Sequence, residues 1–278
     1  AGQWPHLTWD YPQLVPALWS VLYLWQDSSE IEVFIRIWMG FFPVALVLVF
    51  LAAYSWWRRW PLLLAGAAMT GILLIPYSQV LDGGYVDVPV TFAVALAVHW
   101  QLLALSDEAR SRYWLLFATV ATALALLIKQ GGLLALLPWL WTLWCLRARR
   151  QQLLQAVCLL LVLVVPWYGL SWWHGSGDSV VSYVTRDIYG SETLQQRVMR
   201  ALVQTLPAVT GLAAYNKLAA SAMFIIIGGV ILALRDRGGR LYVLFGGIGL
   251  LGWAGFFSYD GRNLLPTIPL ILFVLAHG

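Results

Sequence analysis

Four polar groupings lie where apolar runs of the sequence begin or end. They are centred on Asp10, Asp87, Lys129 and Arg262. A carboxylate at a membrane border can orient or deprotonate a hydroxyl or amine nucleophile. Lysine and arginine at a similar depth can hold a phosphate, arginine through two parallel hydrogen bonds and lysine as a point charge. Together these groups fit a substrate whose lipid tail stays in the bilayer while its phosphate-bearing head group reacts in water.

The composition indicates the elements that must position these groups. Hydrophobic residues occupy 61% of the 278 positions and charged residues only 11%, whereas a soluble domain carries about 25% charged and about 45–50% apolar residues. The apolar runs recur along the whole chain, so we expect residues 1–278 to form a single domain embedded in the lipid bilayer. The net charge of +4 is small, and a nucleic-acid partner is therefore not expected.

The apolar runs predict the number of spanning helices, because one span needs about 20 mainly apolar residues. Nine segments are expected as spans: 31–55, 60–77, 88–105, 113–128, 133–146, 152–172, 218–234, 241–258 and 263–277. Residues 12–25 predict a shorter, amphipathic juxtamembrane helix, and residues 174–216 predict an outer loop region. The expected fold class is an all-α, polytopic transmembrane helical bundle.

The cations gather in every second connection between these spans. Four short loops hold ten of the 17 lysines and arginines: Arg58 and Arg59, Arg110 and Arg112, Arg147, Arg149 and Arg150, and Arg235, Arg237 and Arg240. Loops rich in lysine and arginine remain in the cytoplasm. We therefore expect these four loops to be cytoplasmic and the four polar groupings to lie on the opposite face.

Lys129 is expected to lie below the outer surface of the membrane. Segments 113–128 and 133–146 would rise only about 24 and 21 Å at ~1.5 Å per residue, less than a ~30 Å hydrocarbon core. Their connection, residues 129–132, would then be drawn inward. An ionisable residue at that depth is a candidate functional residue by default.

Each grouping also has a purely structural interpretation. Asp87 would cap a helix N-terminus, Lys129 would extend its ammonium to the interface without a ligand, and Arg262 would pair with Asp260. Asp10 would only begin the amphipathic helix. The residues alone leave these alternatives open. No HExxH or paired-ligand spacing occurs in the sequence, so no cofactor is expected and a divalent metal has little support.

Four short segments carry a resemblance to a known family. They are Asp10-Tyr11-Pro12 before an apolar helix, Tyr85-Val86-Asp87-Val88-Pro89, Ile128-Lys129-Gln130-Gly131 and Arg262-Asn263-Leu264-Leu265-Pro266. Their order and content resemble the integral-membrane glycosyltransferases of the GT-C class, especially bacterial relatives of protein mannosyltransferases and lipid A aminoarabinose transferase. Together the segments extend over nearly the whole chain, and the second is the most specific.

The resemblance implies an enzyme that takes a sugar from a polyprenyl-phosphate-linked donor. The acceptor would be a lipid, glycan or protein on the non-cytoplasmic face, and the transfer would invert the anomeric centre by direct displacement. By the same comparison, Asp87 corresponds to a catalytic or acceptor-orienting carboxylate. Lys129 and Arg262 correspond to basic residues that bind the donor phosphate.

Asp10, Tyr11 and Tyr85 are carried over as further substrate-binding residues, the first two lining the entrance of the site. The main catalytic acid of the family usually follows the first spanning helix, in the first outer loop. The chain begins at Ala1 in what matches the end of that loop. We therefore expect a fragment that lacks the first spanning helix and most of that loop, and the comparison leaves the general base open.

Two other functional classes remain as alternatives. A secondary transporter would place charged residues near the bilayer midplane on broken helices, often in two repeated halves. The sequence shows no such halves, and transport therefore ranks second. A non-enzymatic assembly or scaffold subunit would tolerate replacement of the outer acids and bases. The resemblance further implies a location in the bacterial inner membrane, with the site of the enzyme facing the periplasm or exterior.

Overall fold

The computed structural model describes residues 32–74, 86–147, 149–173, 193–202, 227–235, 237–257 and 261–277. In these ranges every regular element is a helix. The α-helices are α2 (Glu32–Trp57), α3 (Pro61–Leu74), α5 (Asp87–Ser106), α6 (Ser111–Ile128), α7 (Leu136–Cys145), α8 (Arg150–Trp173), α10 (Leu194–Arg200), α13 (Arg237–Gly252) and α14 (Ile268–His277). Two 3-10 helices, η2 (Gln130–Ala135) and η7 (Gly261–Thr267), and the π-helix η6 (Trp253–Phe257) accompany them. Residues 227–233 are also helical.

Four of these helices are long and apolar enough to cross a membrane. They are α2 from Gly40, α5, α6 and α8 up to Leu170. The described part of the chain is therefore all-helical, and its long apolar helices indicate a membrane protein. Shorter apolar helices cover Pro61–Leu74, Gly131–Cys145 and Asn263–His277, where the sequence predicts spans. The count of nine spans is not shown by the described residues and stays a prediction.

Several predicted features lie wholly or largely outside the described residues. These are the juxtamembrane helix 12–25, the span at 218–234 except for its helical end 227–233, and most of the outer loop region 174–216. Within that loop region, residues 194–200 form α10, which begins with a capping box between Thr193 and Gln196.

Helix α5 is the centre of the bundle. Of the residues in its most apolar stretch, 78% are buried, against 6% in the corresponding stretch of α8. A helix that is apolar on every side is either buried in protein or faces lipid. In α5 even the polar groups between its ends, such as His99 and Gln101, are buried, so this helix lies within the protein. The helix packs against α6 on one side and against α2 on another.

Alanines set the close packing of α5 on α6. Ala93 and Ala97 of α5 share one buried cluster with Ala121 and Ala125 of α6. Small side chains let two helix backbones approach closely, and such packing drives helix association where lipid removes the hydrophobic advantage. The α5–α6 pair is thus a closely packed unit that positions the residues at its two ends.

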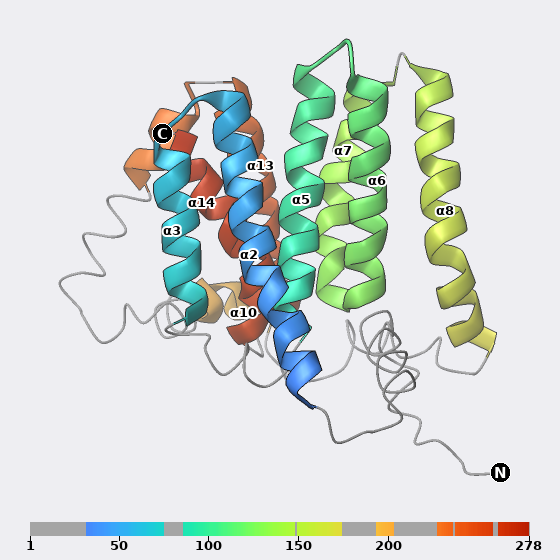
Figure 1. Cartoon of the computed structure of the whole chain (residues 1–278), viewed down its shortest axis with the longest axis horizontal. Coiled ribbons are helices and arrows are strands. Elements are labelled where there is room, and N and C mark those ends of the chain that lie inside the picture. The colour runs from blue at the N-terminus through green and yellow to red at the C-terminus, as the bar shows by residue number, and fades with distance from the viewer. Residues whose placement is uncertain are drawn as a thin grey trace.

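Figure 1 shows how the other helices flank α5. α2, α3, α13 and α14 stand on one side, where their apolar side chains form the largest buried cluster with one face of α5. α6, α7 and α8 stand on the other side, and α8 is outermost (Figure 1). Many large apolar side chains of α8 are exposed, including Leu154, Val162 and Val165, as expected of a helix that faces lipid.

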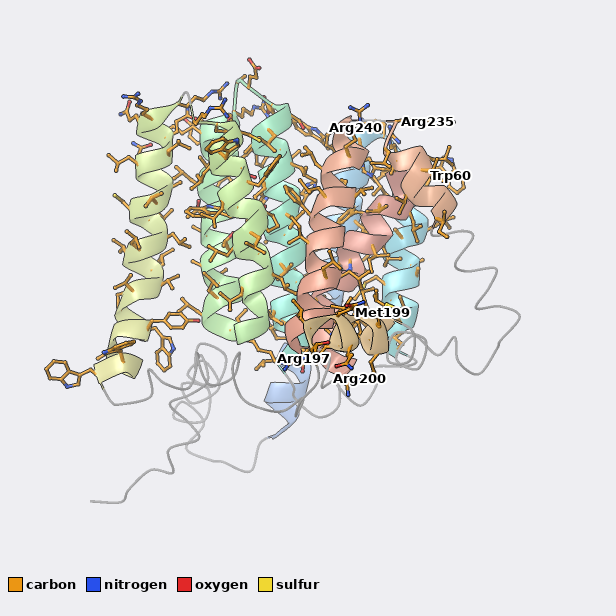
Figure 2. All side chains as sticks on the ribbon, turned by 180° about the vertical axis from the view of Figure 1, so that it is seen from behind. Trp60, Arg197, Met199, Arg200, Arg235 and Arg240 are labelled. Carbon is orange, nitrogen blue, oxygen red and sulfur yellow. The ribbon has the colours of Figure 1, made fainter. Side chains whose placement is uncertain are left out.

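The four arginine-bearing connections lie at one end of the bundle. The α2–α3, α5–α6 and α7–α8 connections share the upper end in Figure 1. Arg235 and Arg240, before and within α13, are labelled at this same end in Figure 2, whereas Arg197 and Arg200 of α10 lie at the opposite end. The arginines that occur in every second loop of the sequence therefore lie at the same end of the described helices.

Candidate functional site

The first residue of α5 is a buried acid. Asp87 is 2% exposed and lies in the first turn, where unpaired backbone N–H groups carry the positive end of the helix dipole. Pro89 follows, and this position needs no N–H donor because the first turn has no intrahelical acceptor for it. The hydroxyl of Thr91 donates to the Asp87 carbonyl at 2.6 Å. The carboxylate is thus fixed at the end of α5 that is far from the arginine loops.

Lys129 is placed by an abrupt end of α6. Its backbone is extended, with φ −159° and ψ 153°, and η2 begins at the next residue. Gly132 makes this turn possible, because a Cβ there would lie 2.0 Å from the Ala125 carbonyl oxygen. The Gly132 N–H instead donates to the Lys129 carbonyl at 2.8 Å. The glycine lets η2 fold back on the last turn of α6 and turns Lys129 into the protein.

The third participant is Asn263 in η7. Leu264 and Leu265, which follow it, are fully buried, and η7 packs against α5 and η2. These two leucines anchor the short helix in the core. Their burial brings Asn263, itself 6% exposed, to the point where α5 begins and α6 ends.

The three side chains converge on one ammonium group. Lys129 Nζ forms a buried salt bridge with Asp87 Oδ1 and donates to Asn263 Oδ1 at 2.9 Å. The lysine residue is only 9% exposed. We call Asp87, Lys129 and Asn263 the Asp–Lys–Asn cluster. Its members come from the start of α5, the residue after α6 and η7, and they are separated by 42 and 134 residues in the chain.

The cluster is electrically balanced and largely removed from water. One carboxylate offsets one ammonium, and the amide of Asn263 adds a neutral acceptor. Moving two charges out of water costs several kcal/mol per ion, which is recovered only with good pairing and further hydrogen bonds. The Asn263 amide and the dipole of α5 supply such interactions. Removing either charge alone would leave its partner buried and uncompensated.

The predicted site residues separate into three groups. Asp87 and Lys129 are in direct contact. Arg262 is the second residue of η7 and precedes Asn263, which places its backbone next to the cluster, but its side chain lies outside the described residues. Asp10, Tyr11 and Tyr85 also lie outside the described residues. The catalytic and phosphate-binding roles of these six residues remain predictions.

Asn263 is the functional candidate that sequence reasoning did not single out. It stands in the segment Arg262-Asn263-Leu264-Leu265-Pro266, whose only residue proposed for the site was Arg262. A signal was present, because an amide directly before a buried apolar pair is a polar group drawn toward a core. In a core such a group needs a hydrogen-bond partner, and Lys129 is that partner.

Other buried polar groups lie deeper in the bundle. Gln101 of α5 donates to Thr122 of α6 at 3.3 Å, and its Oε1 atom has no hydrogen-bond partner among the described residues. His99 is buried as a packing residue, yet its Nδ1 atom likewise has no partner in the part of the chain that the structure describes. Within the described ranges neither group has a charged partner, which distinguishes them from the Asp–Lys–Asn cluster.

The cluster has the groups for acid–base and anion chemistry. A carboxylate can accept a proton from a hydroxyl or amine, and an ammonium can hold a phosphate as a point charge. The described residues contain no group of three or more His, Cys, Asp or Glu side chains suited to a metal. Comparison of the chain with protein-family models, with curated proteins and with solved structures finds no match.

Proposed function

We propose that this protein is an integral-membrane glycosyltransferase of the GT-C type. It transfers a sugar from a polyprenyl-phosphate-linked donor to a lipid, glycan or protein acceptor. The observation that carries the proposal is the Asp–Lys–Asn cluster, in which three of the four segments that resemble the family meet. Segments far apart in the chain have no local reason to converge, so their contact favours a common role.

In the proposed reaction, Asp87 orients the acceptor and receives its proton. The acceptor oxygen or nitrogen attacks the anomeric carbon of the donor sugar as the bond from that carbon to the phosphate oxygen breaks. The electron pair of that bond leaves with the polyprenyl phosphate, which Lys129 and Arg262 stabilise. Developing negative charge opposite fixed cations is the electrostatic situation that lowers such barriers most. One displacement inverts the anomeric centre.

The proposed orientation puts the arginine loops in the cytoplasm and the cluster toward the periplasm or exterior of a bacterial inner membrane. It is supported by the common end of the four arginine connections (Figures 1 and 2) and by the rule that short loops rich in arginine stay inside. The cluster lies at the end of the bundle opposite these arginines, where α5 begins and α6 ends. In this orientation the nine proposed spans include the composite helices η2–α7, α13–η6 and η7–α14.

Transfer by the full-length protein in membranes tests the function. Wild-type protein should convert a polyprenyl-phosphate sugar into glycosylated acceptor, and Asp87→Asn should abolish this conversion while leaving membrane insertion unchanged. The matched control is Asp107→Asn, the same change at the other end of α5, which should retain activity. Wild-type turnover by Asp87→Asn would remove Asp87 from the mechanism.

A secondary transporter is the second candidate, and one observation favours it. The backbone between α6 and α7 is broken by the extended Lys129 and the 3-10 helix η2, and transporters bind substrates at such interruptions. The cluster, however, lies at the ends of α5 and α6 instead of at their middle. Solute uptake into proteoliposomes with no glycosyl product would favour transport over transfer.

A further inference from the structure

The salt bridge raises a question about the proposed phosphate site. In the structure the ammonium of Lys129 is occupied by Asp87 and Asn263, and the cluster has no net charge. A phosphate approaching Lys129 meets an adjacent carboxylate that repels it. Like charges a few ångströms apart near a protein surface repel about as strongly as opposite charges at the same distance attract, so the repulsion is comparable to the attraction.

The two partners of Lys129 differ in how they would respond to an anion. Asn263 is neutral, so it does not repel a phosphate, and its hydrogen bond to the ammonium can remain when a phosphate binds. Asp87 competes with the phosphate for the same cation. Lysine has three N–H donors, and a lysine side chain has enough rotatable bonds to keep the Asn263 contact while it exchanges the charged partner.

We propose that Asp87 is an intramolecular counter-ion that holds the phosphate position on Lys129 until a lipid-linked phosphate replaces it. The exchange releases the carboxylate from its salt bridge and so makes it available to the acceptor. Donor binding thus precedes acceptor activation, and the carboxylate is kept paired whenever no donor is bound. This inference rests on the proposed function, because it assigns Lys129 to a phosphate and Asp87 to an acceptor.

Binding of farnesyl phosphate to the full-length protein in nanodiscs tests the exchange. Asp87→Asn removes the competing charge and keeps the size of the side chain. It should bind farnesyl phosphate at least about tenfold more tightly than wild type, as expected from the loss of one nearby repulsive charge. Asp107→Asn, the matched change at the arginine end, should bind like wild type. Equal or weaker binding by Asp87→Asn overturns the inference.

Asn263→Asp provides a second test that does not depend on the folding of Asp87→Asn. This variant keeps a partner on Lys129 but adds a second carboxylate to compete with the phosphate. Its affinity for farnesyl phosphate should fall by about tenfold or more. Unchanged or tighter binding by Asn263→Asp overturns the exchange even where Asp87→Asn cannot be purified.

Two further arms separate this inference from its alternatives. Inorganic phosphate measured in the same way should bind more weakly than farnesyl phosphate, and a gain confined to inorganic phosphate would overturn a lipid-linked ligand. Transfer assays separate the inference from the function. Tighter binding by Asp87→Asn with no product from wild type would refute transfer and retain the exchange, whereas product from wild type without tighter binding would refute the exchange alone.

Discussion

The two ends of α5 each carry an aspartate, and the two aspartates are held in different ways. Asp107 follows the last residue of α5 and is half-buried. It accepts hydrogen bonds from the Arg110 N–H at 3.2 Å and from Trp114 Nε1 at 3.1 Å. Asp87 begins the helix, is almost fully buried and pairs with an ammonium. Asp107 is thus held by neutral N–H donors at a half-exposed position, whereas Asp87 is held by a charged ammonium in the protein interior.

The comparison teaches how to distinguish a structural acid from a candidate catalytic one. The partners of Asp107 lie three and seven residues away, so they shape a local turn between α5 and α6. The partner of Asp87 lies 42 residues away and shares its ammonium with a third helix. Burying a charge pair costs free energy. The pair at the start of α5 is therefore a better functional candidate than the local contacts of Asp107.

The largest effect is expected where the buried pair is broken. Lys129→Met leaves the carboxylate of Asp87 buried without a charged partner, and it should lower the free energy of unfolding by about 3–5 kcal/mol. Unfolding in detergent, followed by tryptophan fluorescence, measures the change. The double variant Asp87→Leu with Lys129→Met should recover most of the stability, because no charge is then left alone. A single variant as stable as wild type would contradict this account of the pair.

A smaller effect is expected from the turn that positions Lys129. Gly132→Ala forces a methyl group against the Ala125 carbonyl and should cost about 1–3 kcal/mol, the range for overpacking. Its matched control is Gly131→Ala, where a Cβ meets nothing within 4 Å. The two variants should differ in unfolding free energy and in farnesyl phosphate binding. Equal behaviour would show that the turn is not what holds Lys129.

At the arginine end, loss of the aspartate should matter less. Asp107→Ala removes the acceptor for Arg110 and Trp114, and it should cost about 1 kcal/mol because water can replace part of these interactions. Glu108→Ala, at an exposed neighbouring position, should stay within about 0.5 kcal/mol of wild type. The same unfolding experiment measures both. A loss for Asp107→Ala as large as that for Lys129→Met would erase the difference between the two ends.

The smallest effect is expected between the two ends. Gln101→Met removes one long hydrogen bond to Thr122 together with a buried oxygen that has no partner in the described ranges. Replacing a poorly satisfied polar group by an apolar one of similar volume should change the unfolding free energy by less than about 1 kcal/mol. A loss of several kcal/mol would mean that Gln101 is part of a larger polar network.

Much of the architecture could be predicted from the sequence, because it depends on local composition. The apolar runs predict α2, α5, α6 and α8 near their observed bounds. The arginine pattern predicts that alternate connections share an end, and the helices do arrange them so (Figure 1). The shorter elements were harder to predict, since 3-10 and π segments interrupt the apolar runs at 130–135, 253–257 and 261–267.

By itself, the sequence determined which polar groups had to be explained. An acid and a lysine at the borders of apolar helices, as at Asp87 and Lys129, are expensive in a membrane protein, and that expense is visible without a structure. The charge pattern likewise determined that they stand at the end opposite the arginines. These properties follow from residue type and from position along a helix.

Only the tertiary structure decided how these groups are combined. Successive residues of a 3-10 helix point about 120° apart, so the docking of η7 against α5 determines that Asn263 faces Lys129. The close fit of Gly132 on Ala125 determines that Lys129 turns inward. Contacts across 42 and 134 residues depend on how helices pack. Packing is a property of the whole bundle, because each helix end is positioned by its neighbours.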